Sequence, residues 1–462
     1  MKHACVGGGA ENPQACQAPA EGAPIAARYD GLHRGGQNVD GRVLMLRALY
    51  RSASLRTAAA MGLGGVGFSL GSLLLARALP TREYGLVSLV LGIVAVAGLT
   101  APLGLDQVAA RRGIRLEAGW RRAALLACAT TAFGAAIVAR LIYHLSFPLA
   151  ISVALITLTL GVAQSAGGHF QGQQHLRTAV WVVQLLNGSL ALVALLAFAL
   201  GLRSASAVCL ALAAVGLLGA AAVWRLVRIR EGAGGRQPKA WGLRREAASL
   251  LAVQTGGAAF LQLERLLLGP IVGLHDLALY SVLAALVSSP FRLLQSAVQF
   301  TLIPTLRVAG DAGARRAKIA REGGLIFITI AAGSVAIWAL APPLARWLVA
   351  GRYTLSHALI GAALVSGFLK VLSGFMTAVV VSCGEERRLR YLSLACWGSI
   401  GVSLAGAFLA GRCGLIAVIY GIAAGWLIRC VFTAWLALPY LRAPRAGARL
   451  PREARLRPSG SR

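Results

Sequence analysis

Apolar runs of about 20 residues repeat along the chain from Leu55 onward, separated by short polar segments. A helix of that length crosses the hydrocarbon core of a bilayer. The pattern therefore predicts an all-α polytopic membrane protein with about twelve transmembrane helices. We expect these helices at residues 55–79, 84–105, 122–143, 147–167, 179–201, 205–227, 247–272, 278–303, 323–341, 355–383, 391–411 and 413–438.

The polar segments divide this series into parts. Residues 1–54 are rich in Gly, Ala, Gln and Pro, a composition typical of a disordered tail. Residues 228–246 separate the sixth run from the seventh, and their Gly, Pro and charged residues indicate a linker. We therefore expect six helices within 55–227 and six within 247–438, followed by a basic tail at 439–462.

Charge adds an orientation to this picture. The chain is 57% hydrophobic and only 13% charged, yet its net charge is +30. If the N-terminus is cytoplasmic, the segments on that side carry roughly five basic residues for each one outside, as the positive-inside rule requires. We expect a bacterial inner (plasma) membrane protein with both termini in the cytoplasm. Its basic loops then face anionic membrane lipids, which accounts for the charge without nucleic acid.

Four basic residues fall inside predicted spans, namely Arg265, Arg292, Lys370 and Arg429, against one acidic residue there, Glu264. A charge within a bilayer usually faces a cavity or a partner, because exposure to lipid costs about 2.5–3.5 kcal/mol. The imbalance predicts a cationic cavity that takes a transported anion. The alternative is that each cation reaches the interface or binds backbone carbonyls.

Two stretches resemble the polysaccharide transporter family of the multidrug/oligosaccharidyl-lipid/polysaccharide (MOP) flippase superfamily. The first is "LLLARALPTREYGLVSLV" (73–90) followed by "APLGLDQVAARR" (101–112), and the second is "LERLLLGPIVGLHDLALYSVLAALVSSPFRLLQSAVQFTLIPTL" (263–306). The resemblance extends over residues 50–440 and is carried by order and spacing. It implies a MATE-like fold of two six-helix lobes around a central cavity.

The resemblance also implies a function. The protein would move an undecaprenyl-diphosphate-linked oligosaccharide to the periplasmic leaflet during O-antigen, capsule or exopolysaccharide synthesis. The lobes would alternate access to the cavity. A polysaccharide polymerase complex is a further expected partner. Because guanidinium groups suit phosphates, we expect the diphosphate to bind Arg265, Arg292, Lys370 and Arg429.

Amide and hydroxyl side chains recur within the same spans. Ser288, Arg292, Gln295 and Gln299 are spaced at i, i+4, i+7 and i+11, so the four share one face of a helix. Such a stripe lines water or packs against another polar helix, and we favour the cavity. For the residues in the first half, interhelical hydrogen bonding is an equal alternative. The predicted polar lining comprises Gln164, Gln184, Asn187, Gln262, Ser288, Gln295 and Gln299.

Glu264 directly precedes Arg265, so their side chains point about 100° apart on a helix and do not pair well. Glu264 therefore either forms a fixed ion pair with a cation on another helix or titrates and couples transport to H⁺ or Na⁺. We retain it as the candidate coupling residue. No other cofactor is expected.

Other functions fit less well. The eight cysteines form no CxxC pair, and His169 and His175 lack a third ligand, so no metal site is expected. No nucleophile pairs with a base, and the periplasmic loops are too short for a polymerase or ligase, so we expect no enzyme. A multidrug or cation antiporter would need acidic cavity residues. A peptidoglycan lipid-precursor flippase stays an alternative.

Overall fold

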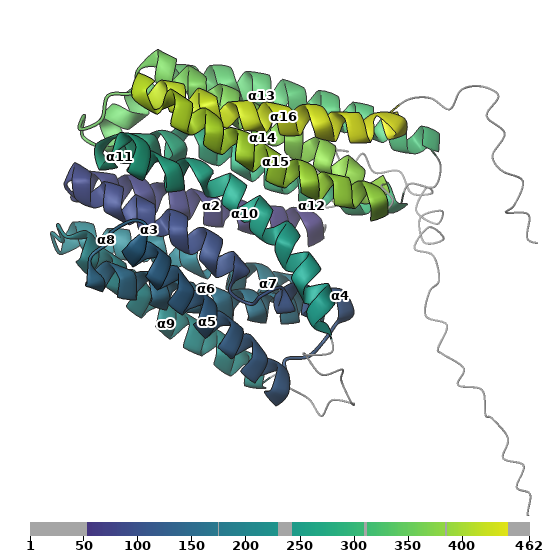
Figure 1. The fold of residues 1–462 in the computed structure, drawn as a ribbon, viewed down its shortest axis with the longest axis horizontal. Coiled ribbons are helices and arrows are strands. Elements are labelled where there is room, and N and C mark those ends of the chain that lie inside the picture. The colour runs from purple at the N-terminus through teal and green to yellow at the C-terminus, as the bar shows by residue number, and fades with distance from the viewer. Residues whose placement is uncertain (1–52, 174, 230–242, 309–311, 384–385, 442–462) are drawn as a thin grey trace, which may run out of the picture. The chain divides into compact units, whose positions relative to one another are not determined.

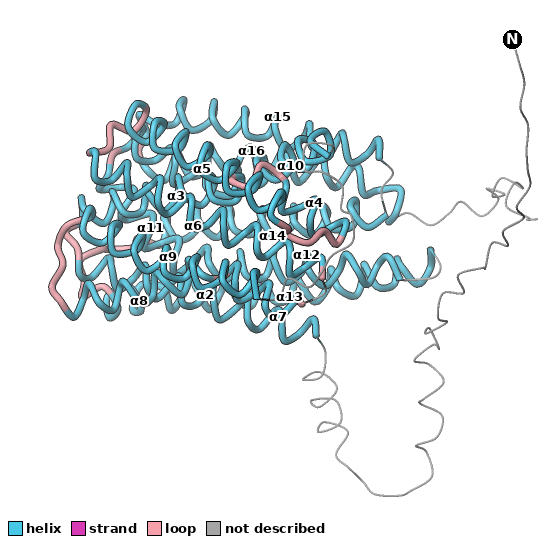
Figure 2. Tube along the Cα trace, turned by 90° about the horizontal axis from the view of Figure 1, so that it is seen from below, coloured by secondary structure: helices cyan, strands magenta, loops and turns pink. Residues whose placement is uncertain are grey.

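The computed structural model describes residues 53–173, 175–229, 243–308, 312–383 and 386–441. Within these ranges the chain forms helices joined by short loops, without strands (Figure 2). Most of the predicted N-terminal tail, linker and C-terminal tail lies outside the described residues, and the end of the predicted linker, residues 244–246, belongs to helix α10 (Arg244–Val272). The all-helical membrane fold is thereby confirmed.

The helices of the first half follow the predicted runs. They are α2 (Ala53–Ala78), α3 (Thr81–Thr100), α4 (Leu105–Arg112), α5 (Ala118–Leu141), α6 (Phe147–Gly172), α7 (Leu176–Val183), α8 (Leu185–Ala199) and α9 (Ala205–Ile229). The short helix α4 has no counterpart among the predicted spans. It begins after Gly104, whose φ of 80° permits the sharp turn out of α3.

The helices of the second half include one irregular turn. They are α10 (Arg244–Val272), α11 (Leu274–Leu283), a π-helical turn (Ala284–Ser288), α12 (Ser289–Val308), α13 (Ala312–Leu348), α14 (His357–Cys383), α15 (Glu386–Ala410) and α16 (Leu415–Leu441). Each of the twelve predicted spans coincides with one helix or with a run of consecutive helices.

Not every helix is long and apolar enough to cross a membrane by itself. In the described part, nine helical segments meet that requirement, and a tenth does if the bent pair α7 and α8 counts as one span. The described apolar part of α2, Gly62–Ala78, is shorter. Helix α10 has 29 residues but carries Glu264 and Arg265. The number of spans is therefore lower than twelve because the described apolar part of α2 is short and because α10 contains charged residues.

The described helices pack into two groups that meet along α2, α3, α10 and α11. Figure 1 shows α13 to α16 on one side and α5, α6, α8 and α9 on the other. Helix α3 contacts α10 closely, and a Cβ added at Gly85 would lie 2.4 Å from the carbonyl oxygen of Leu274 on α11. The contact between the two groups is therefore partly a contact between backbones.

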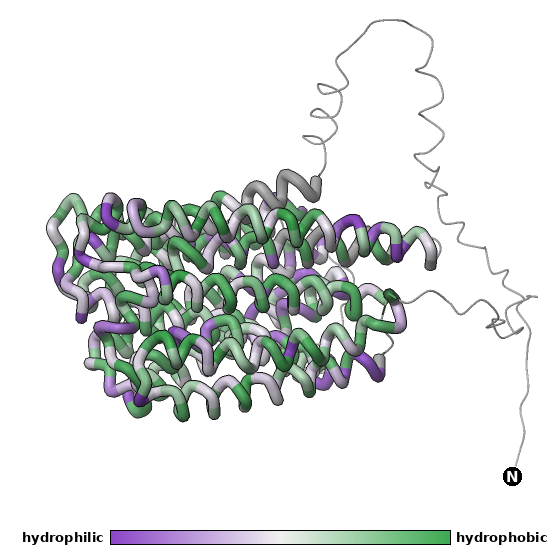
Figure 3. The backbone as a smooth tube through the Cα atoms, turned by 90° about the horizontal axis from the view of Figure 1, so that it is seen from above, coloured by the Kyte–Doolittle hydropathy of each residue, from purple (hydrophilic) through white to green (hydrophobic). Residues whose placement is uncertain are grey.

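Many large apolar side chains are exposed, and Figure 3 shows that hydrophobic residues recur along the helices. On α13, only 11% of the most apolar stretch is buried, and Phe327, Trp338 and Trp347 are exposed. A soluble protein rarely exposes such a continuous apolar surface. Lipid is the solvent that suits it.

Two breaks in regular helix geometry lie at the boundary between the groups. Helices α7 and α8 meet at Gln184 with a bend of 44°. The π-helical turn Ala284–Ser288 contains one extra residue per turn just before α12. Both breaks change the direction in which the following side chains point, and both contribute to the cavity described next.

A cationic cavity between the helix groups

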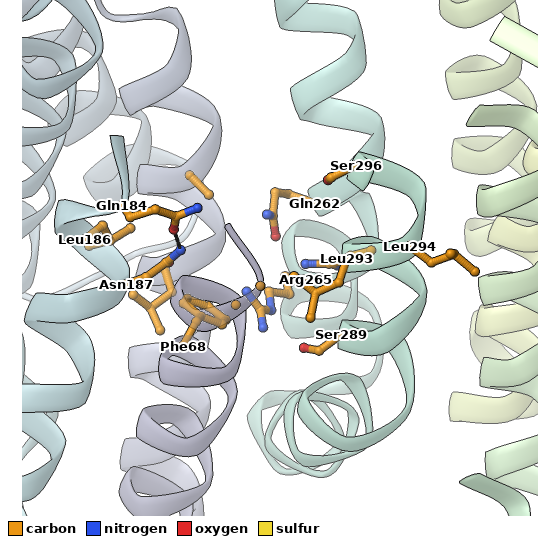
Figure 4. A pocket seen from close by; sticks show the side chains of 15 residues that line it. Phe68, Gln184, Leu186, Asn187, Gln262, Arg265, Ser289, Leu293, Leu294 and Ser296 are labelled. Carbon is orange, nitrogen blue, oxygen red and sulfur yellow. Dashed lines mark hydrogen bonds between the residues drawn. The ribbon is translucent and has the colours of Figure 1, made fainter. Parts of the chain in front are cut away.

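A cavity of about 530 Å³ lies between α2, α3, α8, α10 and α12. We call it the cationic cavity, because Arg265 and Arg292 are its only charged lining residues among those the structure describes. Figure 4 shows Gln184 and Asn187 on one side of it and Gln262 and Arg265 on the other. The remaining lining is apolar or weakly polar, comprising Gly62, Gly65, Phe68, Leu91, Ala95, Leu186, Ser289, Leu293, Leu294 and Ser296.

Arg265 is held in the wall of this cavity by α10. Its side chain is only 3% exposed, and its guanidinium carbon lies 5.3 Å from the centre of the Phe68 ring. Gly92 on α3 makes room for it, since a Cβ there would lie 3.0 Å from the Arg265 Cβ. The Arg265 Nε has no hydrogen-bond partner among the described residues. Such a buried donor is costly unless a ligand or water satisfies it.

Arg292 enters the same cavity from α12. Its Nη2 donates to the Leu261 carbonyl oxygen at 3.1 Å, while its Nε lacks a partner in the described part of the chain. One hydrogen bond uses only one of the five donors of a guanidinium group. Arg292 is therefore oriented by the protein and still able to bind an anion.

Glu264 does not compensate these arginines, because it is paired with Lys370. The Lys370 Nζ, on α14, donates to the Glu264 Oε1, and both side chains are nearly fully buried. The Ser366 hydroxyl donates to the same oxygen at 3.4 Å. The second carboxylate oxygen, Oε2, has no partner among the described residues. No acidic residue among the described lining residues therefore balances the two arginines of the cavity.

Arg429 has a different environment. Its guanidinium carbon lies 5.5 Å from the centre of the Phe260 ring and 5.3 Å from that of the Trp426 ring. The two rings stack with centroids 3.9 Å apart. Aromatic faces attract cations through their quadrupole, so these rings stabilise this half-buried charge. Of the four predicted cations, the structure brings two to the cavity and gives Lys370 and Arg429 other partners.

The predicted polar lining is divided in the same way. Gln184, Asn187 and Gln262 line the cationic cavity, whereas Gln164 lines a smaller cavity beside α4. Ser288 is buried but does not line either one. Gln295 instead packs on α14, where a Cβ at Gly374 would lie 2.6 Å from its Cγ. The Gln299 side chain lies outside the described residues.

Helix α12 presents Ser289 and Ser296 to the cavity together with Arg292. Ser289, Arg292 and Ser296 are spaced at i, i+3 and i+7, so they lie on one face of the helix. This face differs from the predicted one, although both contain Arg292. Side-chain spacing predicted the stripe with Ser288, Gln295 and Gln299, and neither Ser288 nor Gln295 lines the cavity. The orientation of α12 after the π-helical turn decides which of the two stripes faces the cavity.

Comparisons with known proteins agree with this architecture. Residues 59–308, more than half of the chain, match the family model described as "Polysaccharide biosynthesis protein". No curated protein matches the chain.

Three solved structures share the fold at low sequence identity. A multidrug resistance MATE family transporter of the MOP superfamily, in an inward-facing conformation, is 14% identical, with a TM-score of 0.57 over 81% of this chain and 94% of that chain. The MATE multidrug transporter DinF-BH is 15% identical, with a TM-score of 0.56 over 88% of this chain and 97% of that chain. The eukaryotic MATE transporter AtDTX14 is 15% identical, with a TM-score of 0.54 over 87% and 99%.

The structural likeness establishes the fold, and the family match covers the helices that carry Arg265 and Arg292. The structural neighbours are transporters, not enzymes. The chain therefore belongs to the polysaccharide biosynthesis protein family, and it is a multi-pass membrane protein that shares the fold of the MATE transporters compared above.

Proposed function

We propose that the protein is a flippase for polyprenyl-diphosphate-linked oligosaccharides. The cargo enters from the cytoplasmic leaflet of a bacterial inner membrane and leaves in the periplasmic leaflet. The diphosphate binds Arg265 and Arg292, while the polyprenyl chain stays in lipid. A sugar head group needs such a route because its hydroxyl groups lose their hydrogen bonds in hydrocarbon.

The observation that carries this proposal is the uncompensated charge of the cationic cavity. Two guanidinium groups line about 530 Å³ without an acidic neighbour among the lining residues. The nearby carboxylate of Glu264 is paired with Lys370. Guanidinium groups bind phosphate oxygens in a bidentate manner, so a diphosphate supplies the missing negative charge.

Lys370 and Arg429 have supporting roles in this proposal. Each has a partner already, so neither contacts the diphosphate in the arrangement described above. The Glu264–Lys370 pair is the candidate for H⁺ or Na⁺ coupling, because protonation of the acid would unbalance a buried pair. The two lobes, 55–227 and 247–438, rock about the site in the manner of other secondary transporters.

A multidrug or cation antiporter is the less favoured function. Cationic drugs would meet two arginines and no free acid in the cationic cavity. A flippase for lipid-linked peptidoglycan precursors shares the diphosphate chemistry. Its cargo provides a second substrate for the assay below.

We expect Arg265→Gln and Arg292→Gln each to lower transport at least about tenfold, since each removes a charge-assisted contact to phosphate. The measurement follows a labelled lipid-linked oligosaccharide across vesicles that contain the purified protein. Arg346→Gln is the matched control, because Arg346 is exposed at the end of α13 and lines neither cavity. Wild-type rates in both cavity variants would contradict the proposal.

A further inference from the structure

A second cavity of about 250 Å³ lies between α4, α6 and α7 and is not used by the function proposed above. Five of its lining residues carry an amide or a carboxylate. We call it the amide cavity, and these residues are Asp106, Gln107, Gln164, Gln171 and Gln184. Such a volume is many times larger than a single water needs.

Asp106 is fixed in the wall of the amide cavity. Its side chain is 3% exposed, and its Oδ2 accepts a hydrogen bond from the Gln107 Nε2 at 3.1 Å. Its Oδ1 is buried without a partner among the described residues. Helix α4 is not one of the candidate spans, and burial there raises the pKa of the Asp106 carboxyl above its usual value. An unpartnered buried acceptor of this kind is the mark of a site that a ligand or water completes.

Glycines on α6 bring the walls of this cavity together. A Cβ added at Gly168 would lie 2.4 Å from the carbonyl oxygen of Asp106, and one at Gly167 would lie 2.6 Å from a methyl group of Val183. Both glycines line the cavity. Direct contact between α4 and the backbone of α6 therefore fixes where the Asp106 carboxylate lies.

The chemistry of this lining suits hydroxyl groups. A hydroxyl both donates and accepts, an amide side chain offers both functions, and a carboxylate offers acceptors. An anion would find no basic side chain among the described lining residues. A cation would find only one acid among the described lining residues. An uncharged, hydroxyl-rich ring satisfies the amides and the acid together.

Gln184 lies between the two cavities, because it lines both of them. It lies at the break between α7 and α8, and its Oε1 accepts a hydrogen bond from the Asn187 Nδ2. The two cavities are therefore neighbours, one lined by two arginines and the other by amides and a single acid among the described residues.

We propose that the amide cavity binds the uncharged sugar rings next to the diphosphate, with Asp106, Gln164 and Gln171 as hydrogen-bonding partners of their hydroxyl groups. The inference rests on the proposed function. It adds a sugar subsite whose chemistry favours neutral over acidic sugars near the diphosphate.

Binding of two lipids to the full-length protein in nanodiscs tests this subsite. One probe is undecaprenyl diphosphate, and the other is undecaprenyl diphosphate that carries a neutral disaccharide. The sugar should tighten binding to the wild type about tenfold, and Gln164→Leu and Gln171→Leu should each remove most of this gain. When leucine replaces the amide, the sugar hydroxyl loses its hydrogen-bonding partner, so the sugar no longer adds to the affinity. Affinity for the lipid without sugar should stay unchanged.

Gln173→Leu is the matched control, since Gln173 follows α6 and lines neither cavity. It should keep the full gain. Because Gln171 is exposed, its replacement should not disturb folding. A gain that survives in both cavity variants, or that is absent from the wild type, would overturn the sugar subsite. If instead Arg265→Gln and Arg292→Gln bind the lipid without sugar as the wild type does, the proposed function itself fails.

Discussion

Each buried charge in this protein has a particular neighbour, and that neighbour decides its role. Lys370 is nearly fully buried and paired with Glu264, whereas Arg265 has an aromatic ring on one side and a cavity on the other. A buried ion pair is strongly destabilised when one member is removed, because the other remains as an unpaired charge. Replacement of both members is far less costly.

We therefore expect Lys370→Met to lower the free energy of unfolding by about 3–5 kcal/mol, and Glu264→Gln combined with Lys370→Met to recover most of that loss. Thermal unfolding in detergent measures both. If the pair couples transport to an ion, the double variant should also lose the response of transport to a pH or sodium gradient. A double variant less stable than Lys370→Met would contradict the ion pair, and a retained gradient response would exclude Glu264 as the coupling residue.

At the scale of helices, close approach depends on small residues. Helix α4 packs on α6 with Gly168 facing the backbone of Asp106 and Gly172 facing that of Ala109. Small residues at helix contacts are common in membrane proteins, since lipid gives helices no hydrophobic drive to associate. The position of α4, and with it that of Asp106, depends on these glycines.

Gly168→Ala should destabilise the protein by about 1–3 kcal/mol, because the added methyl group would overlap the α4 backbone. Gly134→Ala, on α5, is the control, since a Cβ there meets nothing within 4 Å. It should be neutral or stabilising by up to about 1 kcal/mol, as alanine favours helix. Thermal unfolding in detergent compares the two. Equal effects would show that the contact of α4 with α6 is looser than the structure indicates.

At the scale of the whole helical unit, polar contacts join the two helix groups near both ends of α3. Beyond its C-terminal end, Arg112 of α4 forms an ion pair with Glu246 of α10, with 2.6 Å between Nη2 and Oε2. Before its N-terminal end, the Arg352 Nη1 donates to the Leu79 carbonyl oxygen at 3.1 Å. Rocking of the lobes would have to break these contacts in turn.

Arg112→Cys combined with Glu246→Cys, in a background whose native cysteines are replaced by alanine, tests this motion. A reducible bifunctional thiol reagent should link the two positions and stop transport of the labelled lipid-linked oligosaccharide. Reductant should restore it. Each single-cysteine variant should be unaffected by the reagent. Full transport by the linked protein would show that these helices need not separate.

The sequence by itself determined the helical membrane fold, because apolar runs of spanning length have few alternatives in lipid. It also identified Glu264, Arg265 and Lys370 as charges within the apolar runs, and the structure buries all three. Glu264 was expected either to pair with a cation on another helix or to titrate. The structure pairs it with Lys370. The division into lobes and the diphosphate contacts stay predictions.

Only the tertiary structure decided which buried charges share a space. Glu264 and Lys370 are 106 positions apart, and no local pattern indicates that they meet. Side-chain periodicity predicted that Ser288, Gln295 and Gln299 face the cavity with Arg292, whereas the packing of α12 places Ser289 and Ser296 there. Asp106 was not recognised, since a single acid beside a glycine turn has no distinctive pattern. Contacts between distant segments determine where a side chain points, and spacing along one helix does not contain that information.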